Sequence, residues 1–411
     1  MSVPPPHAPE TLPPQGTWRE VLAAFLRLGL TSFGGPVAHL GYFRAEFVER
    51  RRWLEDRAYA DLMALCQFLP GPASSQVGIA IGLSRAGYPG ALAAWIGFTT
   101  PSAVLMVLFA YGVTVWGDVA GSAWLHGLKV AAVAVVAQAV LGMMRTLAPD
   151  RARATLAVAA ATIVLLVPTA WSQIAAIILG AMAGVTLLRN DAAKDHAALP
   201  LDVRVTRAAG ALMLFAFFAL LIGLPLLAAA VPAQPIRLID AFYRAGSLVF
   251  GGGHVVLPLL QAEVVPPGWV SNDAFLAGYG AAQAVPGPLF TFAAYLGAVM
   301  GPEPSGWLGA CICLGAIFLP SFLLVIGALP FWDALRSQPV AQAALKGVNA
   351  SVVGLLLGAL YHPVWTSGIT STGDFALATL AFLLLFMWQV PPWLVVILSA
   401  ASGAALAALQ L

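Results

Sequence analysis

Two arginines stand inside apolar stretches of the chain, each seven residues before a pair of glycines. Arg27 precedes Gly34-Gly35, and Arg244 precedes Gly251-Gly252. A charged side chain inside a membrane segment is costly unless it is paired or hydrated, and it indicates a functional site. The planar guanidinium group binds tetrahedral oxyanions through paired hydrogen bonds. We therefore expect the two arginines to converge on one cavity and to neutralise a dianion together.

Each glycine pair belongs to one of two kinds of break that interrupt apolar stretches. Phe33-Gly34-Gly35-Pro36 ends one stretch and Pro70-Gly71-Pro72 ends the next, and both kinds return in the second half of the chain. A break inside the bilayer frees backbone groups that lipid cannot satisfy, so broken backbone has to line a cavity. The half-helix that follows aims its N–H groups and positive dipole end at that cavity, which favours an anion.

Polar side chains near the breaks extend the candidate anion site. Gln67 and Gln283 each precede a Pro-Gly-Pro break by three residues, and hydroxyl side chains follow it. Lys129 and Lys346 form a second symmetric basic pair. The residues expected to contact the substrate are Arg27, Arg244, Gly34, Gly35, Gly251, Gly252, Gln67, Gln283, Gly71, Gly287, Ser74, Ser75, Thr291, Lys129 and Lys346.

Three titratable residues are candidates for proton coupling. Glu46 and Glu263 occupy equivalent positions in the two halves, and acidic residues at membrane depth commonly relay protons. His254 follows the second glycine break, and histidine is the side chain that titrates near neutral pH.

Structural interpretations compete with these functional ones. The breaks can be kinks that allow close helix packing, and a lone arginine or lysine can extend to the nearer membrane interface. Glu46 lies in a basic run and can form a surface ion pair, while His254 can make a structural hydrogen bond.

The composition identifies a polytopic membrane protein. Of 411 residues, 60% are hydrophobic and only 9% are charged, whereas soluble domains carry roughly a quarter charged residues. The mean hydropathy is +0.87. These values exclude a soluble enzyme, a nucleic-acid-binding protein and a disordered scaffold. The three cysteines lie in apolar segments without neighbouring histidines or acids, so we expect neither a disulfide framework nor a metal site, and no cofactor.

About thirteen apolar stretches follow one another, and several are shorter than the roughly 20 residues that a crossing needs. We therefore expect an all-α membrane protein with broken or re-entrant helices. The expected organisation is a disordered cytoplasmic tail over 1–17, a first transporter repeat over 18–189, a polar linker over 190–207, a connecting transmembrane helix over 208–231 and a second repeat over 235–411.

The two repeats match at a nearly constant displacement. QFLPGP from Gln67 returns as QAVPGP from Gln283, and LKVAAVAVV from Leu128 returns as LKGVNASVV from Leu345. The displacement between matching residues stays between 216 and 219. So little drift over so many matches indicates an internal duplication.

The charges predict opposite orientations for the two repeats. Five arginines lie between Arg44 and Arg57, whereas the matching stretch 261–273 contains neither Lys nor Arg. By the positive-inside rule the first loop is cytoplasmic and its counterpart is not. The sequence therefore predicts two inverted-topology repeats, an architecture common among secondary transporters.

These motifs resemble the chromate ion transporter family. The residues concerned are FGGP followed by RRRWL, the QFLPGP break and the second-half copies FGGGH and QAVPGP, and the resemblance covers about residues 18–405 in the family's two-domain long form. It implies a multi-pass protein of the bacterial inner membrane that exports chromate and gives chromate resistance. It also implies coupling to the proton motive force, in agreement with the lack of a Walker A sequence GxxxxGK[ST].

Other functions stay open from the residues alone. Sulfate shares charge, shape and hydrogen-bond pattern with chromate, and an anion channel is the alternative to a carrier. An intramembrane enzyme would need a motif such as HExxH or GxSxG, and the sequence has neither, so we expect no enzymatic activity. The expected partners are a chromate-like or sulfate-like oxyanion and the lipid bilayer, and no nucleic acid. The sequence leaves open whether the protein forms a homodimer.

Overall fold

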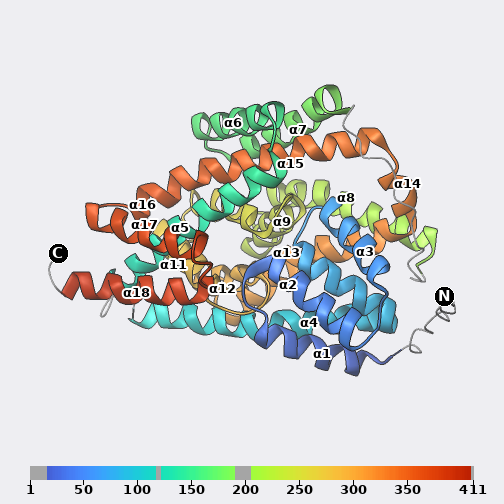
Figure 1. Cartoon of the computed structure of the whole chain (residues 1–411), viewed down its shortest axis with the longest axis horizontal. Coiled ribbons are helices and arrows are strands. Elements are labelled where there is room, and N and C mark those ends of the chain that lie inside the picture. Colours follow the sequence, from blue (N-terminus) through green and yellow to red (C-terminus); the bar gives the residue numbers. More distant parts are fainter. Residues whose placement is uncertain (1–15, 117–121, 190–204, 409–411) are drawn as a thin grey trace, which may run out of the picture.

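The computed structural model describes residues 16–116, 122–189 and 205–408, and every regular element in these ranges is helical (Figure 1). Six helical segments are long and apolar enough to cross a membrane: Ala73–Thr114, Ala123–Leu147, Ala170–Leu187, Arg207–Ala230, Gly306–Arg336 and Pro339–Gly368. The protein is therefore a multi-pass membrane protein. The predicted tail over 1–17 and linker over 190–207 lie almost wholly outside the described residues.

The first half contains seven α-helices and one π-helix in the described residues. They are α1 (Trp18–Thr31), α2 (Gly35–Phe43), the π-helix η1 (Arg44–Arg50), α3 (Asp56–Phe68), α4 (Ala73–Trp116), α5 (Ser122–Leu147), α6 (Arg151–Leu166) and α7 (Ala170–Leu187). Helix α4 is kinked where Ala86 and Gly87 leave helical geometry, so it consists of a short and a long helix.

The second half repeats this order after the connecting helix α8 (Arg207–Ala230). Its elements are α9 (Gln234–Ser247), η3 (Gly253–Val255), α10 (Val256–Val264), α11 (Asn272–Ala282), η4 (Leu289–Thr291), α12 (Phe292–Val299), α13 (Gly306–Ala328), η5 (Leu329–Phe331), α14 (Trp332–Arg336), α15 (Pro339–Ala359), η6 (Leu360–Trp365), α16 (Thr366–Gly368), α17 (Thr372–Phe386) and α18 (Pro392–Ala408).

The breaks are sites where glycine is needed for its backbone geometry. Gly34 and Gly35 have φ of 101° and 79°, and Gly251 and Gly252 have φ of 72° and 155°. These conformations carry little penalty for glycine and are strained for other residues. Pro36 then occupies the first turn of α2, where its missing N–H leaves no hydrogen bond unmade. The helices before these glycine pairs therefore end at the breaks that the sequence predicts.

The two halves exchange their last two helices. Helices α6 and α7 pack along α15, and helices α17 and α18 pack along α5 (Figure 1). Small residues allow this close approach, because a Cβ atom on Gly347 of α15 would collide with the carbonyl oxygen of Gly180 on α7. Each half is therefore completed by the other.

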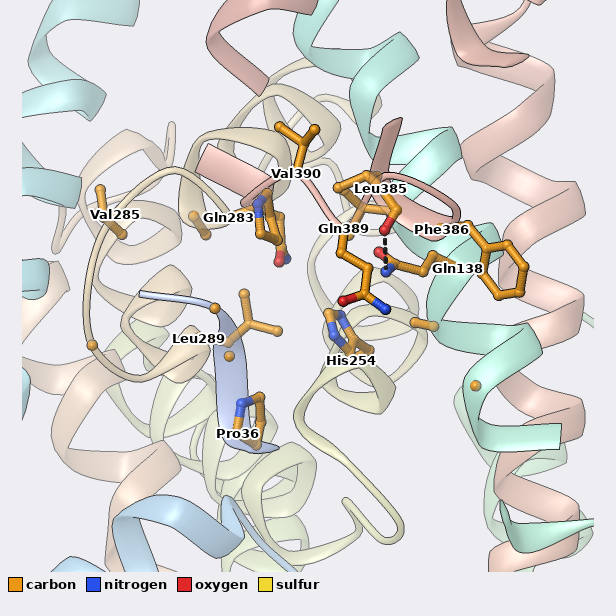
Figure 2. A pocket seen from close by; sticks show the side chains of 18 residues that line it. Pro36, Gln138, His254, Gln283, Val285, Leu289, Leu385, Phe386, Gln389 and Val390 are labelled. Carbon is orange, nitrogen blue, oxygen red and sulfur yellow. Dashed lines mark hydrogen bonds between the residues drawn. The ribbon is translucent and has the colours of Figure 1, made fainter. Parts of the chain in front are cut away.

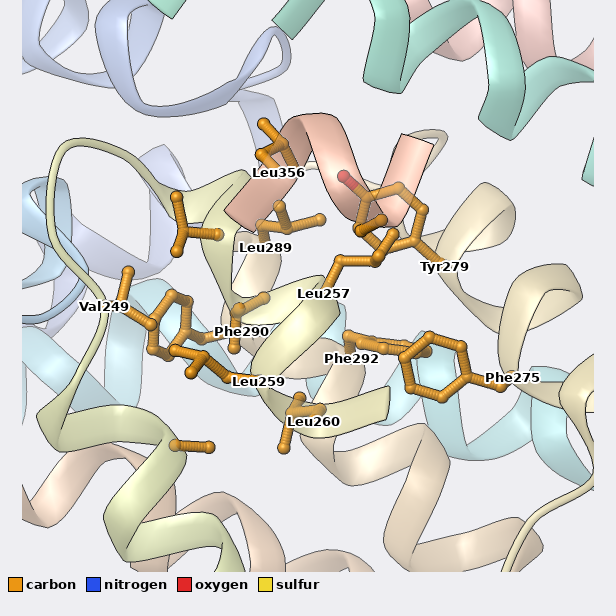
Figure 3. Close-up of a cluster of buried hydrophobic side chains, with 14 of the residues drawn as sticks. Val249, Leu257, Leu259, Leu260, Phe275, Tyr279, Leu289, Phe290, Phe292 and Leu356 are labelled. Atoms are coloured by element: carbon orange, nitrogen blue, oxygen red, sulfur yellow. The ribbon is translucent and has the colours of Figure 1, made fainter. Parts of the chain in front are cut away.

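A large apolar core surrounds the second pair of breaks. Figure 3 shows Leu257 and Leu260 of α10 among aromatic side chains from α11, from the turn η4 and from the start of α12. Phe275, Phe290 and Phe292 are all at most 1% exposed. This packing holds the short helices that carry the second breaks in place.

Candidate functional site

A cavity of about 500 Å³ lies where breaks from both halves meet (Figure 2). Its wall comes from the N-terminus of α2, the middle of α5, the 3₁₀ turn η3, the turn between α11 and η4, and the turn between α17 and α18. The glycine break of the first half and the Pro-Gly-Pro break of the second half therefore line one space, although they lie far apart in the sequence.

The first glycine break presents a helix N-terminus to the cavity. Gly34, Gly35 and Pro36 all line it, and helix α2 begins at Gly35. A Cβ atom on Gly35 would meet no other atom within 4 Å, so this glycine borders open space. The first N–H groups of a helix have no intrahelical partner and carry a partial positive charge, which suits them to an anion.

Four polar side chains reach the cavity from separate elements. They are Gln138 of α5, His254 of η3, Gln283 at the end of α11 and Gln389 in the turn before α18 (Figure 2). The Nε2 group of Gln138 donates to the carbonyl oxygen of Leu385 at 3.3 Å. The buried Nε2 group of Gln283 has no partner in the described part of the chain. These side chains can therefore rearrange their hydrogen bonds around a ligand.

The imidazole of His254 is oriented by a buried tyrosine. Its Nδ1 atom shares a hydrogen bond with the hydroxyl of Tyr279 at 2.8 Å, and Tyr279 is fully buried. This contact occupies Nδ1 and leaves Nε2 as the ring nitrogen available to a ligand in the cavity.

The cavity wall carries no fixed charge. Among the residues that the structure describes, no lysine, arginine, aspartate or glutamate lines it, and His254 is its one titratable side chain. The cavity thus offers neutral dipoles and the N-terminus of α2 in place of charged side chains.

Of the residues expected from the sequence, five line this cavity. They are Gly34, Gly35, His254, Gln283 and Gly287. The others lie elsewhere, and their contacts indicate what they do.

The Pro-Gly-Pro turns bind the opposite halves together. The N–H of Gly71 donates to the carbonyl oxygen of Val249 at 2.7 Å, and the N–H of Gly287 donates to the carbonyl oxygen of Ser32 at 2.9 Å. Both glycines have positive φ, 126° and 93°. The two hydrogen bonds are related by the internal repeat, so each turn holds the end of the helix that precedes the other half's glycine break.

Hydroxyl groups near these turns are buried in the protein. Ser74 hydrogen-bonds to the Nδ1 atom of His39 at 3.4 Å, and Thr291 donates to the carbonyl oxygen of Pro288 at 2.9 Å. The hydroxyl of Ser75 is buried without a partner in the described residues. Gln67 is exposed on α3. None of these four predicted contacts lines the cavity.

The two arginines do not share a site. Arg27 is exposed on α1, whereas Arg244 of α9 is largely buried and bonded to two acids. Its Nη2 atom lies 2.8 Å from Asp240 Oδ2 and 3.0 Å from Glu263 Oε2. Neither arginine lines the cavity. The expected convergence on one anion is not found, because the second half provides acids for its arginine.

The first half arranges its equivalent acid differently. Glu46 of η1 accepts hydrogen bonds from Arg50 Nε at 2.6 Å and from Arg51 Nε at 2.7 Å. Burial alone would raise the pKa of Glu46, but the hydrogen bonds from these arginines outweigh it and lower the pKa below its usual value. The two arginines thus stabilise the charged form of Glu46.

The remaining predicted residues also lie outside the cavity wall. Lys129 of α5 pairs with Asp273 of α11 at 3.0 Å, and Lys346 is partly buried on α15. Around the second glycine break, a Cβ atom on Gly251 would approach Leu147, and one on Gly252 would approach Met143. This break therefore packs against α5.

Sequence reasoning missed two of the four polar side chains of the cavity wall. Gln138 is an amide side chain in the middle of an apolar helix, a signal that was present in the sequence. Gln389 lies in a turn with φ of 52°, and only the packing of α17 and α18 on α5 brings it to the cavity.

A second cavity of about 510 Å³ occupies the related junction in the other half. It lies between the α6–α7 turn and α15, as the first cavity lies between the α17–α18 turn and α5. Leu355 and Ala359 line it at positions that match Gln138 and Gly142 of the first cavity. The internal repeat thus relates the two cavities.

Comparison with known proteins agrees with this architecture. The chromate transporter family matches the chain twice, over residues 19–185 and 236–404. The chain is 29% identical over 355 residues to the chromate transport protein of Pseudomonas aeruginosa, covering 84% of this chain and 81% of that protein. It is 28% identical over 393 residues to the chromate transport protein of Cupriavidus metallidurans, covering 93% and 92%.

A shorter relative resembles part of the chain. The uncharacterized transporter YwrB of Bacillus subtilis is 32% identical over 169 residues, which is 40% of this chain and 83% of that protein. No solved structure matches the chain. The two family matches together cover most of the sequence, and the family consists of transporters and not of enzymes. The chain therefore belongs to the chromate transporter family, in the long form with two family domains.

Proposed function

We propose that this protein is a secondary active transporter that exports chromate across the inner membrane of a bacterium and so gives chromate resistance. The observation that carries the proposal is the cavity at which breaks of both halves meet, in a chain whose relatives include named chromate transport proteins. Broken helices that surround a polar cavity are a usual form of substrate site in secondary transporters.

The substrate lies in this cavity, against the N-terminus of α2. Gly34 and Gly35 let the backbone approach the anion, and Gln283 and His254 provide hydrogen bonds. Gly287 shapes the wall through its backbone conformation. Gln138 and Gln389 complete the set of polar contacts. Gly71, which lies outside the wall, holds the second glycine break through its hydrogen bond to Val249.

The two halves work as inverted repeats. The arginine-rich loop at 44–57 faces the cytoplasm, and the equivalent loop, which has neither Lys nor Arg, faces the periplasm. The reciprocal hydrogen bonds of Gly71 and Gly287 support a two-fold relationship between the halves. The two related cavities support alternating access, in which the halves exchange conformations and open each cavity in turn.

Proton movement drives the export. His254 lines the cavity and is the candidate that lies closest to the substrate. Glu263 is the second candidate, since it shares Arg244 with Asp240. Two acids on one guanidinium group leave an excess negative charge, which a proton can balance. Glu46, the third candidate, is bonded to two arginines, which favour its charged form over a protonated one.

The test is uptake of labelled chromate into inside-out membrane vesicles, with and without a pH gradient. We expect saturable chromate uptake that needs the gradient and does not need ATP. Sulfate uptake of the same size, with no chromate uptake, would assign the protein to sulfate. Uptake that does not saturate and follows the membrane potential alone would assign it to anion channels. Vesicles without the protein are the control.

A further inference from the structure

The groups that the cavity presents to an anion are dipoles and not charged side chains. One half-helix, α2, begins at the wall at Gly35, and the 3₁₀ turn η3 that precedes α10 places His254 there. A helix N-terminus acts as about half an elementary positive charge. This partial charge suits a monoanion better than a dianion, which would be left with a larger net negative charge in the cavity.

The charged groups on the surrounding elements are engaged in other contacts. On α5, His126 pairs with Asp374 at 2.7 Å and Lys129 pairs with Asp273 at 3.0 Å. Arg145, also on α5, lies 5.0 Å above the ring of Phe386. On α10, Glu263 is bonded to Arg244 at 3.0 Å. None of these cations lines the cavity, so the described part of the wall has no lysine or arginine to balance a second negative charge.

The polar side chains of the wall also suit an anion that carries a proton. An arginine or lysine only donates hydrogen bonds, so it cannot accept the O–H group of a protonated oxyanion. A glutamine carries both an N–H₂ donor and an oxygen acceptor, and neutral histidine carries one of each. Gln138, Gln283 and Gln389 come from three different elements around His254 (Figure 2). Together they can donate to the bare oxygens and accept from the protonated one.

We propose that the cavity binds its oxyanion in the singly protonated form, so that the transported species is hydrogen chromate and not the chromate dianion. This inference rests on the proposed function and names the substrate species of the same site.

The inference explains how the site distinguishes chromate from sulfate. The two dianions have the same charge and shape, so a site for dianions can hardly separate them. Their acids differ, because chromate takes up its first proton near neutral pH, whereas sulfate does so only in strong acid. A cavity that selects the hydrogen anion thus finds hydrogen chromate in the cell but almost no hydrogen sulfate.

The deciding measurement is chromate uptake as a function of pH on the loading side, with the membrane potential and the pH difference held constant. We expect the apparent KM for total chromate to rise by about tenfold per pH unit in the alkaline range, as the hydrogen form disappears. The KM calculated for hydrogen chromate alone should stay constant. A KM for total chromate that is independent of pH would overturn the inference while leaving chromate transport itself intact.

Selenate provides a matched competitor. It is nearly the size of chromate but, like sulfate, is fully ionised at neutral pH. We expect a large excess of selenate or sulfate not to inhibit chromate uptake. Inhibition by selenate as strong as that by unlabelled chromate at alkaline pH would show that the site accepts dianions. The absence of any chromate uptake would instead contradict the proposed function.

Two variants separate titration of the substrate from titration of the protein. In His254→Gln the pH dependence of KM should persist, since it belongs to the substrate; its loss would place the titration on His254 and refute the inference.

In Gln389→Lys a cation enters the wall at an exposed turn, and we expect inhibition by selenate to appear. Gln389→Met, of similar length and no charge, is the control and should show no such gain. Equal behaviour of the two Gln389 variants would count against a charge-poor site.

Discussion

The backbone N–H of Gly71 donates a hydrogen bond to the carbonyl oxygen of Val249 at 2.7 Å. Val249 lies just before the second glycine break, so the Pro-Gly-Pro turn of the first half holds the break of the second. Gly287 makes the reciprocal bond to Ser32 at 2.9 Å. Lipid cannot donate a hydrogen bond to a carbonyl group at a broken helix end. These two bonds from the Pro-Gly-Pro turns therefore satisfy carbonyl groups that would otherwise lack a hydrogen-bond partner.

Alanine at either of these glycines should destabilise the protein. Gly71 has φ of 126°, and its Cβ atom would lie 2.9 Å from the hydroxyl oxygen of Ser321. A residue other than glycine in such a conformation costs about 1–3 kcal/mol. We expect Gly71→Ala and Gly287→Ala to lower the melting temperature in detergent and to reduce chromate flux.

The control for this prediction is Gly315→Ala on α13. A Cβ atom there would meet no other atom within 4 Å, and the backbone is helical. Alanine in a helix interior is favoured over glycine by about 0.5–1 kcal/mol, so stability should be unchanged or slightly higher. If Gly71→Ala melts at the same temperature as Gly315→Ala, the turn does not need glycine.

Arg244 and Arg27 should differ sharply in their effect on stability. Arg244→Gln leaves Asp240 and Glu263 together without their cation, and loss of one partner from a buried charge cluster costs about 3–5 kcal/mol. Arg27 is exposed, so Arg27→Gln should change stability by less than about 0.5 kcal/mol. Thermal unfolding of the two purified variants measures the difference.

A double variant checks the cause of this effect. Glu263→Gln in the Arg244→Gln background removes one of the two unpaired acids, so it should restore much of the lost stability. An Arg27→Gln variant as unstable as Arg244→Gln would show that Arg27 has a buried partner after all.

A bulky side chain at Gly35 should block substrate without unfolding the protein. Gly35 borders the cavity, and a Cβ atom there meets no atom within 4 Å. Gly35→Leu should therefore place its side chain in the space that the anion needs, at a strain of about 1–3 kcal/mol from φ of 79°. Chromate flux should be lost while the protein remains in the membrane.

The matched control is Gly223→Leu on α8, which has open surroundings and should transport normally. Normal flux in Gly35→Leu would show that the break serves packing alone.

The loops at 44–57 and 264–273 should be accessible from opposite sides of the membrane. Glu55 and Pro267 are exposed in these loops, so single cysteines at the two positions report each side. In intact cells an impermeant thiol reagent should label Pro267→Cys and should label Glu55→Cys only after the membrane is opened. The background must lack Cys311, which is exposed. Equal labelling of both loops in intact cells would rule out inverted repeats.

The short-range features of this protein are determined by its sequence. Apolar runs define helices, and the glycine and proline residues end them, because helix formation and positive φ depend on neighbouring residues. Helix α8 spans Arg207–Ala230 in the last apolar stretch before the repeat restarts, and α3 spans Asp56–Phe68 and ends before Pro70-Gly71-Pro72. Similar local patterns at a nearly constant displacement also indicate the duplication, because that comparison does not depend on tertiary contacts.

The tertiary structure decided which polar groups meet. Arg244 has Asp240 and Glu263 as partners, whereas the equivalent Arg27 is exposed. Gln138 and Gln389 share a cavity wall only because α17 and α18 of one half pack along α5 of the other. Which side chains pair depends on packing between segments far apart in the chain. The internal repeat in the sequence therefore identifies equivalent residues in the two halves, but it does not show that their surroundings differ.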